Sequence, residues 1–302
     1  MYEANQLHER LMAAFQSRYP GFRSMRFVFS SEPGGGKSTV LASVPVPDGK
    51  ARICFDNEDS MAYLDAGQEG TDVYTPRRQQ FRMHRLVFPS IEDYAKYFQY
   101  IQKKPEAVGA VCIDNAAIFQ DMIKAFMMSR AENPATLRGI FQQFNAASIL
   151  PNEGLIKKVW PNNPEGNFWA CAKEIPKQFM LMCMRHGIHF LVSTEEGNVW
   201  QDYGKPNARI VGKKAKIWDV WYRYSDAIIS LVREVNTTKP PFGQLYPNQP
   251  KIRLQGFNPR FQMDWEGFVA ELEAATQRSE ADIPKEAQVV LIETFEENRE
   301  AP

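Results

Sequence analysis

The chain has 302 residues, 44% of them hydrophobic and 24% charged, and its 36 basic side chains equal its 36 acidic ones. This composition is typical of a folded protein of one large or two small domains, and the zero net charge excludes a globally basic nucleic-acid binder while leaving room for a local basic patch. No apolar run reaches the ~18 residues of a membrane span and no signal peptide opens the chain, so we expect a cytoplasmic protein with no membrane partner.

Strands that alternate with helices are predicted along most of the chain. Apolar runs bounded by turn residues indicate strands, and apolar residues at helical spacing indicate helices. The predicted strands are 25–30, 51–55, 83–88, 108–113, 188–194, 226–232 and 251–254, and the predicted helices are 3–18, 37–44, 91–103, 116–130, 135–148, 168–186 and 264–276. This alternation predicts an α/β fold with a mainly parallel sheet flanked by helices.

Changes of pattern divide the chain into three parts. An N-terminal helix is expected within residues 1–21, one domain over 22–277, and an acidic tail over 278–302. Within the domain, the proline-rich stretch at about 130–167 is expected to be an insertion with a single helix. Residues 195–224 are polar, basic and aromatic, and we expect them to form a long excursion.

A glycine-rich stretch after the first strand carries the most specific motif of the chain. Its sequence, SSEPGGGKST over residues 30–39, matches the phosphate-loop pattern G-x-x-x-x-G-K-[ST], except that Ser31 stands at the first glycine. In such a loop, backbone N–H groups and a helix N-terminus bind phosphate, Lys37 reaches the β- and γ-phosphates, and the Ser38 hydroxyl ligates Mg²⁺. We therefore predict an ATP and Mg²⁺ site, and the alternative is an ordinary glycine-rich turn. The predicted nucleotide contacts are Ser31, Pro33, Gly34, Gly35, Gly36, Lys37, Ser38 and Thr39.

Hydrolysis needs polar groups beside the phosphates, and three are expected at the carboxyl edge of the sheet. Asp114 ends the most apolar strand, where a Walker B aspartate would hold Mg²⁺, and its alternative role is a helix cap. Because the next residue, Asn115, cannot act as a base, Glu58 after the second strand is the predicted base, unless it is only an exposed loop residue. Thr194 ends another strand and would orient water or sense the γ-phosphate, unless it only bonds its local backbone. Two neighbours of Glu58 are weaker contenders for the base, Asp56 and Asp59.

Residues 209–224 mix basic with aromatic side chains. This mixture is typical of single-stranded nucleic-acid binding. The same basic residues would also serve as a finger that reaches the γ-phosphate bound by a neighbouring subunit, or the segment is a solvated loop with its aromatics packed on the core. The three interpretations remain open. The basic residues concerned are Arg209, Lys213, Lys214 and Lys216.

The cysteines and histidines indicate no metal centre. Neither set of four residues has metal-ligand spacing, so no zinc site is predicted, and the cysteines are expected to be buried free thiols.

The order of these parts resembles that of the small phage-type AAA/RecA-like P-loop ATPases, which are core-only relatives of the RecA-type recombinases. The glycine loop, the short helix stopped at Pro45, and the Asp-Asn-Glu-Asp strand end over residues 56–59 carry the resemblance, which spans about residues 22–235. It implies a five-stranded core in which strand 188–194 lies between the loop strand and the strand that ends in Asp114. It also implies that Glu58 is the catalytic glutamate and that Thr194 sits between Lys37 and Asp114. Two departures from the family pattern stand out, Ser31 in the loop and the pair Glu195-Glu196 after Thr194.

The leading hypothesis for function is a Mg²⁺-dependent ATPase of RecA-like fold that acts on DNA as a homo-oligomer, in phage or mobile-element recombination or replication. A viral protein of this kind would work in the host cytoplasm. The second hypothesis is a nucleotide-dependent switch or loader that binds ATP and a protein partner with little turnover, which Asn115 and the zero net charge favour. A small-molecule kinase fits less well, because the basic loops are mixed with bulky aromatics rather than forming an arginine-rich lid.

Overall fold

The computed structural model describes residues 2–62, 83–160, 167–201, 209–234, 239–245, 256–258 and 260–278, with the backbone alone at 2–4, 198–201 and 209–213. Its strands are β1 (Arg26–Ser31), β2 (Ala51–Asp56), β3 (Met83–Val87), β4 (Val108–Asp114), β5 (His189–Gln201), β6 (Arg209–Ala215), β7 (Ala227–Val232), β8 (Phe242–Leu245) and β9 (Phe261–Gln262). Its α-helices are α1 (Tyr2–Arg18), α2 (Lys37–Ala42), α4 (Ile91–Lys103), α5 (Ala116–Ser129), α6 (Pro134–Gln143), α7 (Glu153–Val159), α8 (Asn167–His186), α9 (Asp219–Tyr224) and α10 (Trp265–Gln277).

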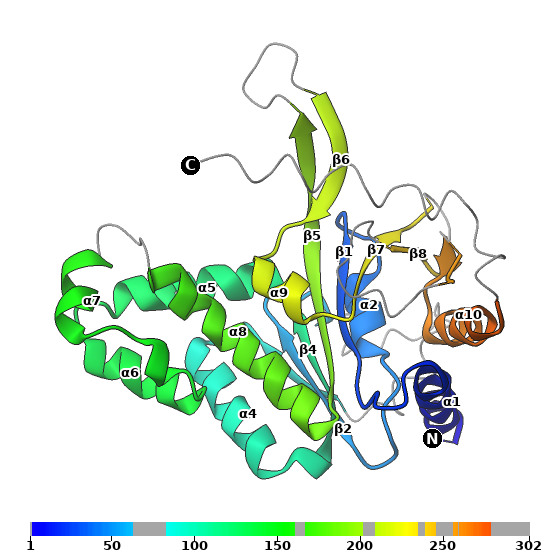
Figure 1. The fold of residues 1–302 in the computed structure, drawn as a ribbon, viewed down its shortest axis with the longest axis horizontal. Coiled ribbons are helices and arrows are strands. Elements are labelled where there is room, and N and C mark those ends of the chain that lie inside the picture. Colours follow the sequence, from blue (N-terminus) through cyan, green and yellow to red (C-terminus); the bar gives the residue numbers. More distant parts are fainter. Residues whose placement is uncertain are drawn as a thin grey trace.

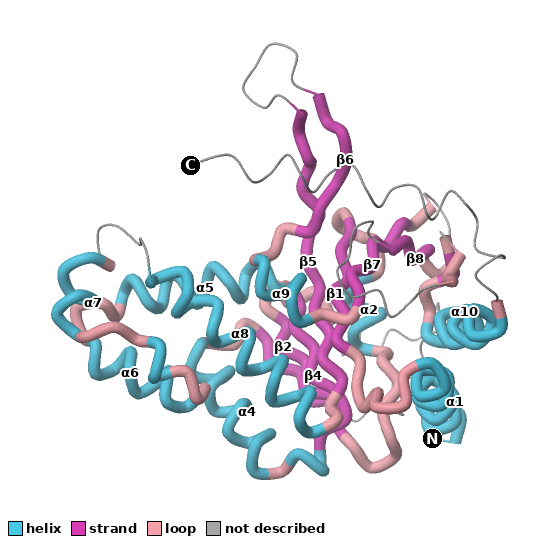
Figure 2. The backbone as a smooth tube through the Cα atoms, in the orientation of Figure 1, coloured by secondary structure: helices cyan, strands magenta, loops and turns pink. Residues whose placement is uncertain are grey.

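The strands of the described chain form one mixed sheet in the order β3-β2-β4-β5-β1-β7-β8-β9, with β6 paired to β5 off this path. All neighbours from β3 to β7 in this order are parallel, whereas β7–β8, β8–β9 and β5–β6 are antiparallel. The prediction of a mainly parallel sheet flanked by helices is therefore confirmed. The central strand β5 lies between β1 and β4, which is the order that the resemblance implies (Figure 2).

Two hydrophobic clusters cover the two faces of the sheet. Val28 of β1 packs in the cluster that contains α4 to α9, whereas its neighbours Phe27 and Phe29 pack with α1, α2 and α10. This division follows from the alternating directions of side chains along a strand. Figure 1 shows the two helical layers on either side of the sheet. Because both faces are covered, β4 is buried along its whole length, which explains its continuous apolar sequence.

Side-chain caps fix where the helices begin. Ser90 forms the predicted capping box, since its Oγ accepts from the Asp93 N–H (3.2 Å) and the Asp93 carboxylate accepts from the Ser90 N–H (2.9 Å). Asn115 caps α5 by accepting a hydrogen bond from the Ala117 N–H (2.9 Å). The connection from β4 to α5 is thus a single residue, which holds Asp114 and Asn115 at the end of the strand.

The insertion at 130–167 contains more helix than the sequence predicts. It holds α6 and α7 where a single helix at 135–148 is expected. Pro134 lies in the first turn of α6 behind its cap Asn133, and α7 begins after its cap Asn152. Proline at the first helical position costs no hydrogen bond, so it marks the start of a helix here rather than a break.

The excursion expected at 195–224 contains regular secondary structure in its described part. This segment contains the outer part of β5, all of β6 and α9. Strands β5 and β6 form a long hairpin that projects beyond the ends of the neighbouring strands (Figure 1). A strand outside the helical layers needs no apolar stripe, so it lacks the hydrophobic pattern that identifies core strands. The edge strands β8 and β9 escape prediction because, with four and two residues, they are too short to show an alternating pattern.

The remaining expectations concern the ends of the chain and the cysteines. Helix α1 is not separate from the domain, because it packs against α10 in the second cluster. The predicted strand 251–254 and all but the first residue of the acidic tail lie outside the described residues. The four cysteines are buried and free, as expected. Among the described helices, none combines the length and apolar character that crossing a membrane requires.

Candidate functional site

The predicted site residues come together at the carboxyl edge of the parallel strands. Strand register aligns Asp56 with Asp114 and Ser30 with Thr194, so the ends of β1, β2 and β4 lie close to Thr194 of β5. The glycine loop follows β1 at this edge, and α2 begins directly after it. The β5–β6 hairpin leaves the sheet on the same side (Figure 1).

Backbone geometry explains the glycines of the loop. Gly36 caps α2 with a φ of 92°, a left-handed backbone conformation that residues other than glycine rarely adopt. A Cβ atom on Gly35 would lie 2.3 Å from the Ser31 hydroxyl oxygen. Ser31, which stands at the usual first glycine, is therefore accommodated because Gly35 has no side chain. Pro33 and Gly34 are exposed at the tip of the loop.

The Lys37 ammonium lies over the loop. Its Nζ donates to the Ser31 hydroxyl (3.1 Å), to the Ser31 carbonyl (3.3 Å) and to the Glu32 carbonyl (3.4 Å). Partial burial lowers the pKa of Lys37, and nearby carboxylates oppose that effect. Those carboxylates are Asp114, Glu58, Glu195 and Glu196. One lysine thus faces several acidic groups, so a polyphosphate would be accepted here more readily together with a cation.

Hydroxyl groups connect the loop to Asp114. The Ser38 hydroxyl donates to the Ser60 hydroxyl oxygen (3.1 Å), and the Ser60 hydroxyl donates to Asp114 Oδ2 (2.6 Å). The Ser193 hydroxyl donates to the other oxygen of Asp114. Sequence reasoning missed Ser60 and Ser193, since neither belongs to a motif and only the strand register brings them to Asp114.

Asp56 holds the turn after β2. Its carboxylate accepts hydrogen bonds from the backbone N–H groups of Ser60 (2.9 Å) and Met61 (2.8 Å) and from Arg85 Nε (2.8 Å). Asp56 is fully buried, and Arg85 also contacts Asp59. Both carboxylates are engaged in these structural contacts, which argues against the weaker candidates for the base, Asp56 and Asp59.

Glu58 lies on the same turn and stays accessible to solvent. Asn115 Nδ2 donates to its carboxylate at 3.4 Å, so the amide that cannot act as a base orients the carboxylate that can. Partial burial and the nearby charge of Asp114 raise the pKa of Glu58. A carboxylate with a raised pKa holds a proton more readily, which suits a general base.

The Thr194 hydroxyl bonds backbone carbonyls, one next to it in sequence and one after β6. This hydroxyl is buried and donates to the Lys216 carbonyl (3.2 Å), and Ser193 makes the contact to Asp114 instead. Thr194 lies on β5, between β1, which leads to the loop with Lys37, and β4, which ends in Asp114. Its side chain nevertheless bonds the carbonyl of Lys216, just after β6. The neighbouring Glu196 accepts hydrogen bonds from Ser30 of β1 (3.0 Å) and Ser230 of β7 (2.5 Å), so it connects β5 to both of these strands.

The aromatic part of the basic segment is packed on the core. Trp221 is fully buried and donates to Gln120 (3.1 Å), and the Tyr222 hydroxyl donates to the Ala215 carbonyl (3.1 Å). Among the basic residues, Lys214 is exposed and Lys216 pairs with Glu195 (3.0 Å). Arg209 and Lys213 lie in β6, and their side chains are outside the described residues.

The donor set at the sheet edge fits Mg²⁺ only in part. In the ranges that the structure describes, no group of three or more His, Cys, Asp or Glu side chains could hold a metal ion by itself. Ser38 and Asp114 offer hydroxyl and carboxylate oxygens, which are the ligand types that Mg²⁺ prefers, and Mg²⁺ commonly completes its shell with water and substrate phosphate. The side chains therefore fit an ion that arrives with a phosphate ligand.

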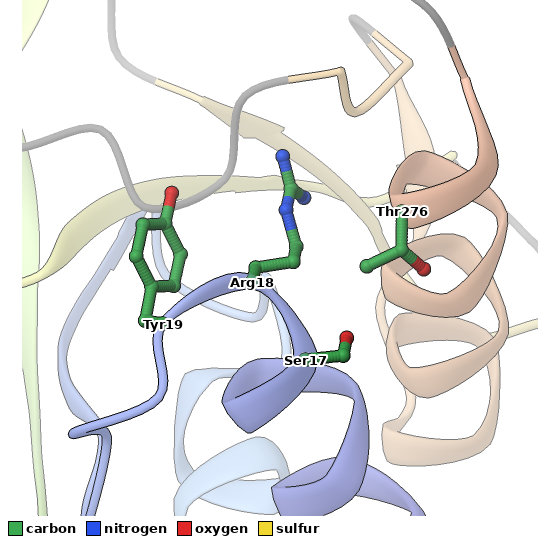
Figure 3. A pocket seen from close by; sticks show the side chains of 4 residues that line it. All are labelled: Ser17, Arg18, Tyr19 and Thr276. Atoms are coloured by element: carbon green, nitrogen blue, oxygen red, sulfur yellow. The ribbon is translucent and has the colours of Figure 1, made fainter.

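A separate hollow of about 560 Å³ lies at the carboxyl ends of α1 and α10 (Figure 3). It is lined by Ser17, Arg18, Tyr19 and Thr276. None of these residues belongs to the sheet edge that carries the loop.

Comparisons with known proteins add no identification. No protein-family model matches the chain, and no curated protein matches it significantly. The observations thus define the class of protein at the level of the fold: an α/β protein with a mostly parallel sheet, covered by helices on both faces, with a polar site at its carboxyl edge.

Proposed function

We propose that the chain is a RecA-like P-loop protein that binds ATP with Mg²⁺, hydrolyses it, and acts on DNA as a homo-oligomer. The observation that carries the proposal is the convergence of Lys37, Ser38, Asp114 and Glu58 at one edge of the sheet. The order of the parallel strands, with β5 between β1 and β4, supports the RecA-like fold.

In this proposal the loop supplies the phosphate site. Backbone N–H groups of the glycine loop and the start of α2 bind phosphate oxygens, and Lys37 exchanges its contacts with Ser31 and Glu32 for contacts with the phosphates. Ser38 and Asp114 would bind the Mg²⁺ ion that accompanies the nucleotide phosphates. When bound, Mg²⁺ would neutralise part of the charge on the phosphates.

Glu58 is the proposed general base. It accepts the proton of the attacking water, and the Asn115 amide holds its carboxylate in place (3.4 Å). Its raised pKa and its solvent access support this role. General-base catalysis contributes about 10²–10⁴-fold in rate, so the loss of this group should be readily measurable.

The test compares the wild-type protein with Lys37→Ala and Glu58→Gln. We expect Lys37→Ala to lose tight ATP binding, because it removes a positive charge that lies over the loop. We expect Glu58→Gln to keep binding and to lose turnover by about 10²–10⁴-fold. Binding is measured with a fluorescent ATP analogue and turnover by phosphate release, with and without single-stranded DNA.

Two outcomes would contradict the proposal at different points. Wild-type turnover no higher than that of Lys37→Ala would exclude the enzymatic activity. Normal turnover by Glu58→Gln would exclude Glu58 as the base while leaving ATP hydrolysis in place.

A second candidate function is a nucleotide-dependent switch or loader that binds a protein partner with little turnover. The burial of Trp221 and the pairing of Lys216 with Glu195 favour it, because both remove groups that would otherwise contact a DNA strand. Tight ATP binding with negligible turnover, and no DNA affinity at low salt, would select this function over the first.

A further inference from the structure

The Ser60 hydroxyl lies between the two side chains that are proposed to hold Mg²⁺. Its oxygen is 3.1 Å from the Ser38 oxygen and 2.6 Å from Asp114 Oδ2. Ser38 therefore reaches Asp114 through Ser60. A cation bound to the Ser38 hydroxyl would meet the Ser60 oxygen on the way to the carboxylate.

The hydrogen bonds leave the Ser60 oxygen able to bind a cation. A hydroxyl has one proton to donate and two lone pairs that accept. The Ser60 hydroxyl donates to Asp114 Oδ2 (2.6 Å), a shorter contact than the one that it makes with Asp56 Oδ1 (3.2 Å), and it accepts a hydrogen bond from Ser38. Because the Ser60 O–H points at the Asp114 carboxylate, the lone pairs of the Ser60 oxygen face Ser38.

The spacing of the two hydroxyl oxygens suits an octahedral ion. With bonds of 2.0–2.1 Å, neighbouring ligands of Mg²⁺ are about 3 Å apart. The observed distance between the Ser38 and Ser60 oxygens is 3.1 Å. The pair is thus already spaced as two adjacent ligands of one ion.

The backbone holds Ser60 in this position independently of its hydroxyl. Its N–H donates to Asp56 Oδ1 (2.9 Å), and the next N–H, of Met61, donates to the other oxygen of the same carboxylate. Arg85 fixes that carboxylate from β3 (2.8 Å). Loss of the Ser60 hydroxyl should consequently leave the turn in place.

We propose that Ser60 is a third oxygen ligand of the Mg²⁺ site, beside Ser38 and Asp114, and that Asp114 also orients the Ser60 hydroxyl. This inference rests on the proposed nucleotide-binding function and adds a residue that no phosphate-loop or Walker B motif contains. Because Ser60 and Glu58 belong to one turn, the cation ligand and the general base are positioned by the same buried carboxylate, Asp56.

The experiment measures how much Mg²⁺ each variant needs to bind a fluorescent ATP analogue, without reference to turnover. In Ser60→Ala we expect the Mg²⁺ requirement to rise about 10–100-fold, the usual effect of losing one group from a metal site, with affinity in the absence of Mg²⁺ unchanged. Ser60→Thr keeps a hydroxyl and should restore the wild-type requirement. Ser129→Ala, at the far end of α5, is the matched control and should behave as wild type.

The variant Ser60→Cys tests for a change in metal preference, which would not occur if Ser60 had only a structural role. A thiol is a poor ligand for Mg²⁺ and a good one for a soft cation. We expect Cd²⁺ to support nucleotide binding by Ser60→Cys better than by Ser60→Ala. Within Ser60→Cys itself, Cd²⁺ should support nucleotide binding better than Mg²⁺ does, and this comparison does not depend on how the alanine variant folds.

The possible results separate the two proposals. If Ser60→Ala has the wild-type Mg²⁺ requirement, or if Cd²⁺ supports the cysteine and alanine variants equally, Ser60 is not a ligand and the nucleotide site itself stands. If the wild-type protein binds the analogue no better than Lys37→Ala, the proposed function fails and the Ser60 inference fails with it.

Discussion

The acidic side chains at the sheet edge differ in what they bind. Asp56 accepts hydrogen bonds from two backbone N–H groups and a guanidinium, and Asp114 accepts from two hydroxyls. Glu58 accepts a longer hydrogen bond from the Asn115 amide and remains exposed. Solvent access therefore increases from the buried Asp56 and Asp114 to the exposed Glu58, which is the order that the proposed roles of scaffold, cation site and base require.

A buried histidine should make the protein sensitive to mild acid. His189 accepts a hydrogen bond from the Met25 N–H at Nδ1 (3.1 Å), and burial lowers its pKa to about 3. In the unfolded chain the pKa of this histidine is about 6.5, so the unfolded chain binds the proton first as the pH falls. The contribution of His189 to stability is therefore complete above pH 6.5 and is lost as the pH falls toward 3. Between pH 7 and pH 5 this histidine alone should reduce the free energy of unfolding by about 2 kcal/mol.

The variant His189→Asn tests this pH dependence. The Asn oxygen can accept the same N–H bond without titrating, so the variant should show a flatter dependence of unfolding free energy on pH in urea titrations. His8, whose ring centroid lies 5.4 Å from that of His189, has a pKa lowered to about 4, chiefly by burial, and supplies a remaining slope. Equal slopes in the wild type and His189→Asn would refute the assignment.

At the level of secondary-structure elements, a buried ion pair joins the starts of two neighbouring strands. Arg26 at the beginning of β1 donates to Asp226 from Nη2 (2.5 Å), Nε (3.1 Å) and its backbone N–H (3.0 Å), and Asp226 is fully buried. Removal of one partner leaves a buried charge uncompensated, so Asp226→Ala should destabilise the fold by about 3–5 kcal/mol.

An exposed pair provides the matched control for this prediction. Arg10 of α1 and Glu273 of α10 approach to 2.7 Å at the surface, and Glu273→Ala should cost less than about 1 kcal/mol. Chemical denaturation measures both losses. Similar costs for the two variants would mean that Arg26 and Asp226 contribute no more than a surface pair.

The elements that could be predicted from the sequence are those whose burial leaves a pattern. Strands β1, β2 and β4 are apolar because helices cover both faces, and Ser90 carries its own capping signal. The outer part of β5 and all of β6 project from the sheet, so no apolar pattern identifies them. The loop and Asp114 were predictable from motif and strand position. Ser60, Ser193 and Arg85 were not, because their contacts depend on register and on the path of a turn.

At the scale of the whole molecule, the β5–β6 hairpin is the proposed contact with DNA. Strand register pairs Gly197 with Lys214, so residues 198–213 can be replaced by an Asn-Gly turn that closes the shortened hairpin. We expect this deletion to keep ATP binding and thermal stability, because the outer part of the hairpin projects beyond the helical layers (Figure 1) and the deletion spares Ala215, which belongs to the first cluster. It should lose affinity for single-stranded DNA and any stimulation of turnover by DNA.

The control for the deletion is Lys104→Ala, which removes a positive charge at the other end of the sheet, after α4. DNA binding is measured by fluorescence anisotropy at several salt concentrations, since phosphate contacts weaken steeply with salt. Undiminished DNA affinity after the deletion would place the DNA contact elsewhere on the protein.

The continuity of β5 has a mechanical consequence. The strand pairs with β1 at Thr194, beside the candidate site, and runs on to Gln201 without an intervening loop. Seven residues of strand span about 23 Å, so a rotation of about 10° at the site would displace the outer end of β5 by about 4 Å. The strand would thus act as a lever arm that amplifies small movements at its fulcrum, where Glu196 joins β5 to Ser30 and Ser230.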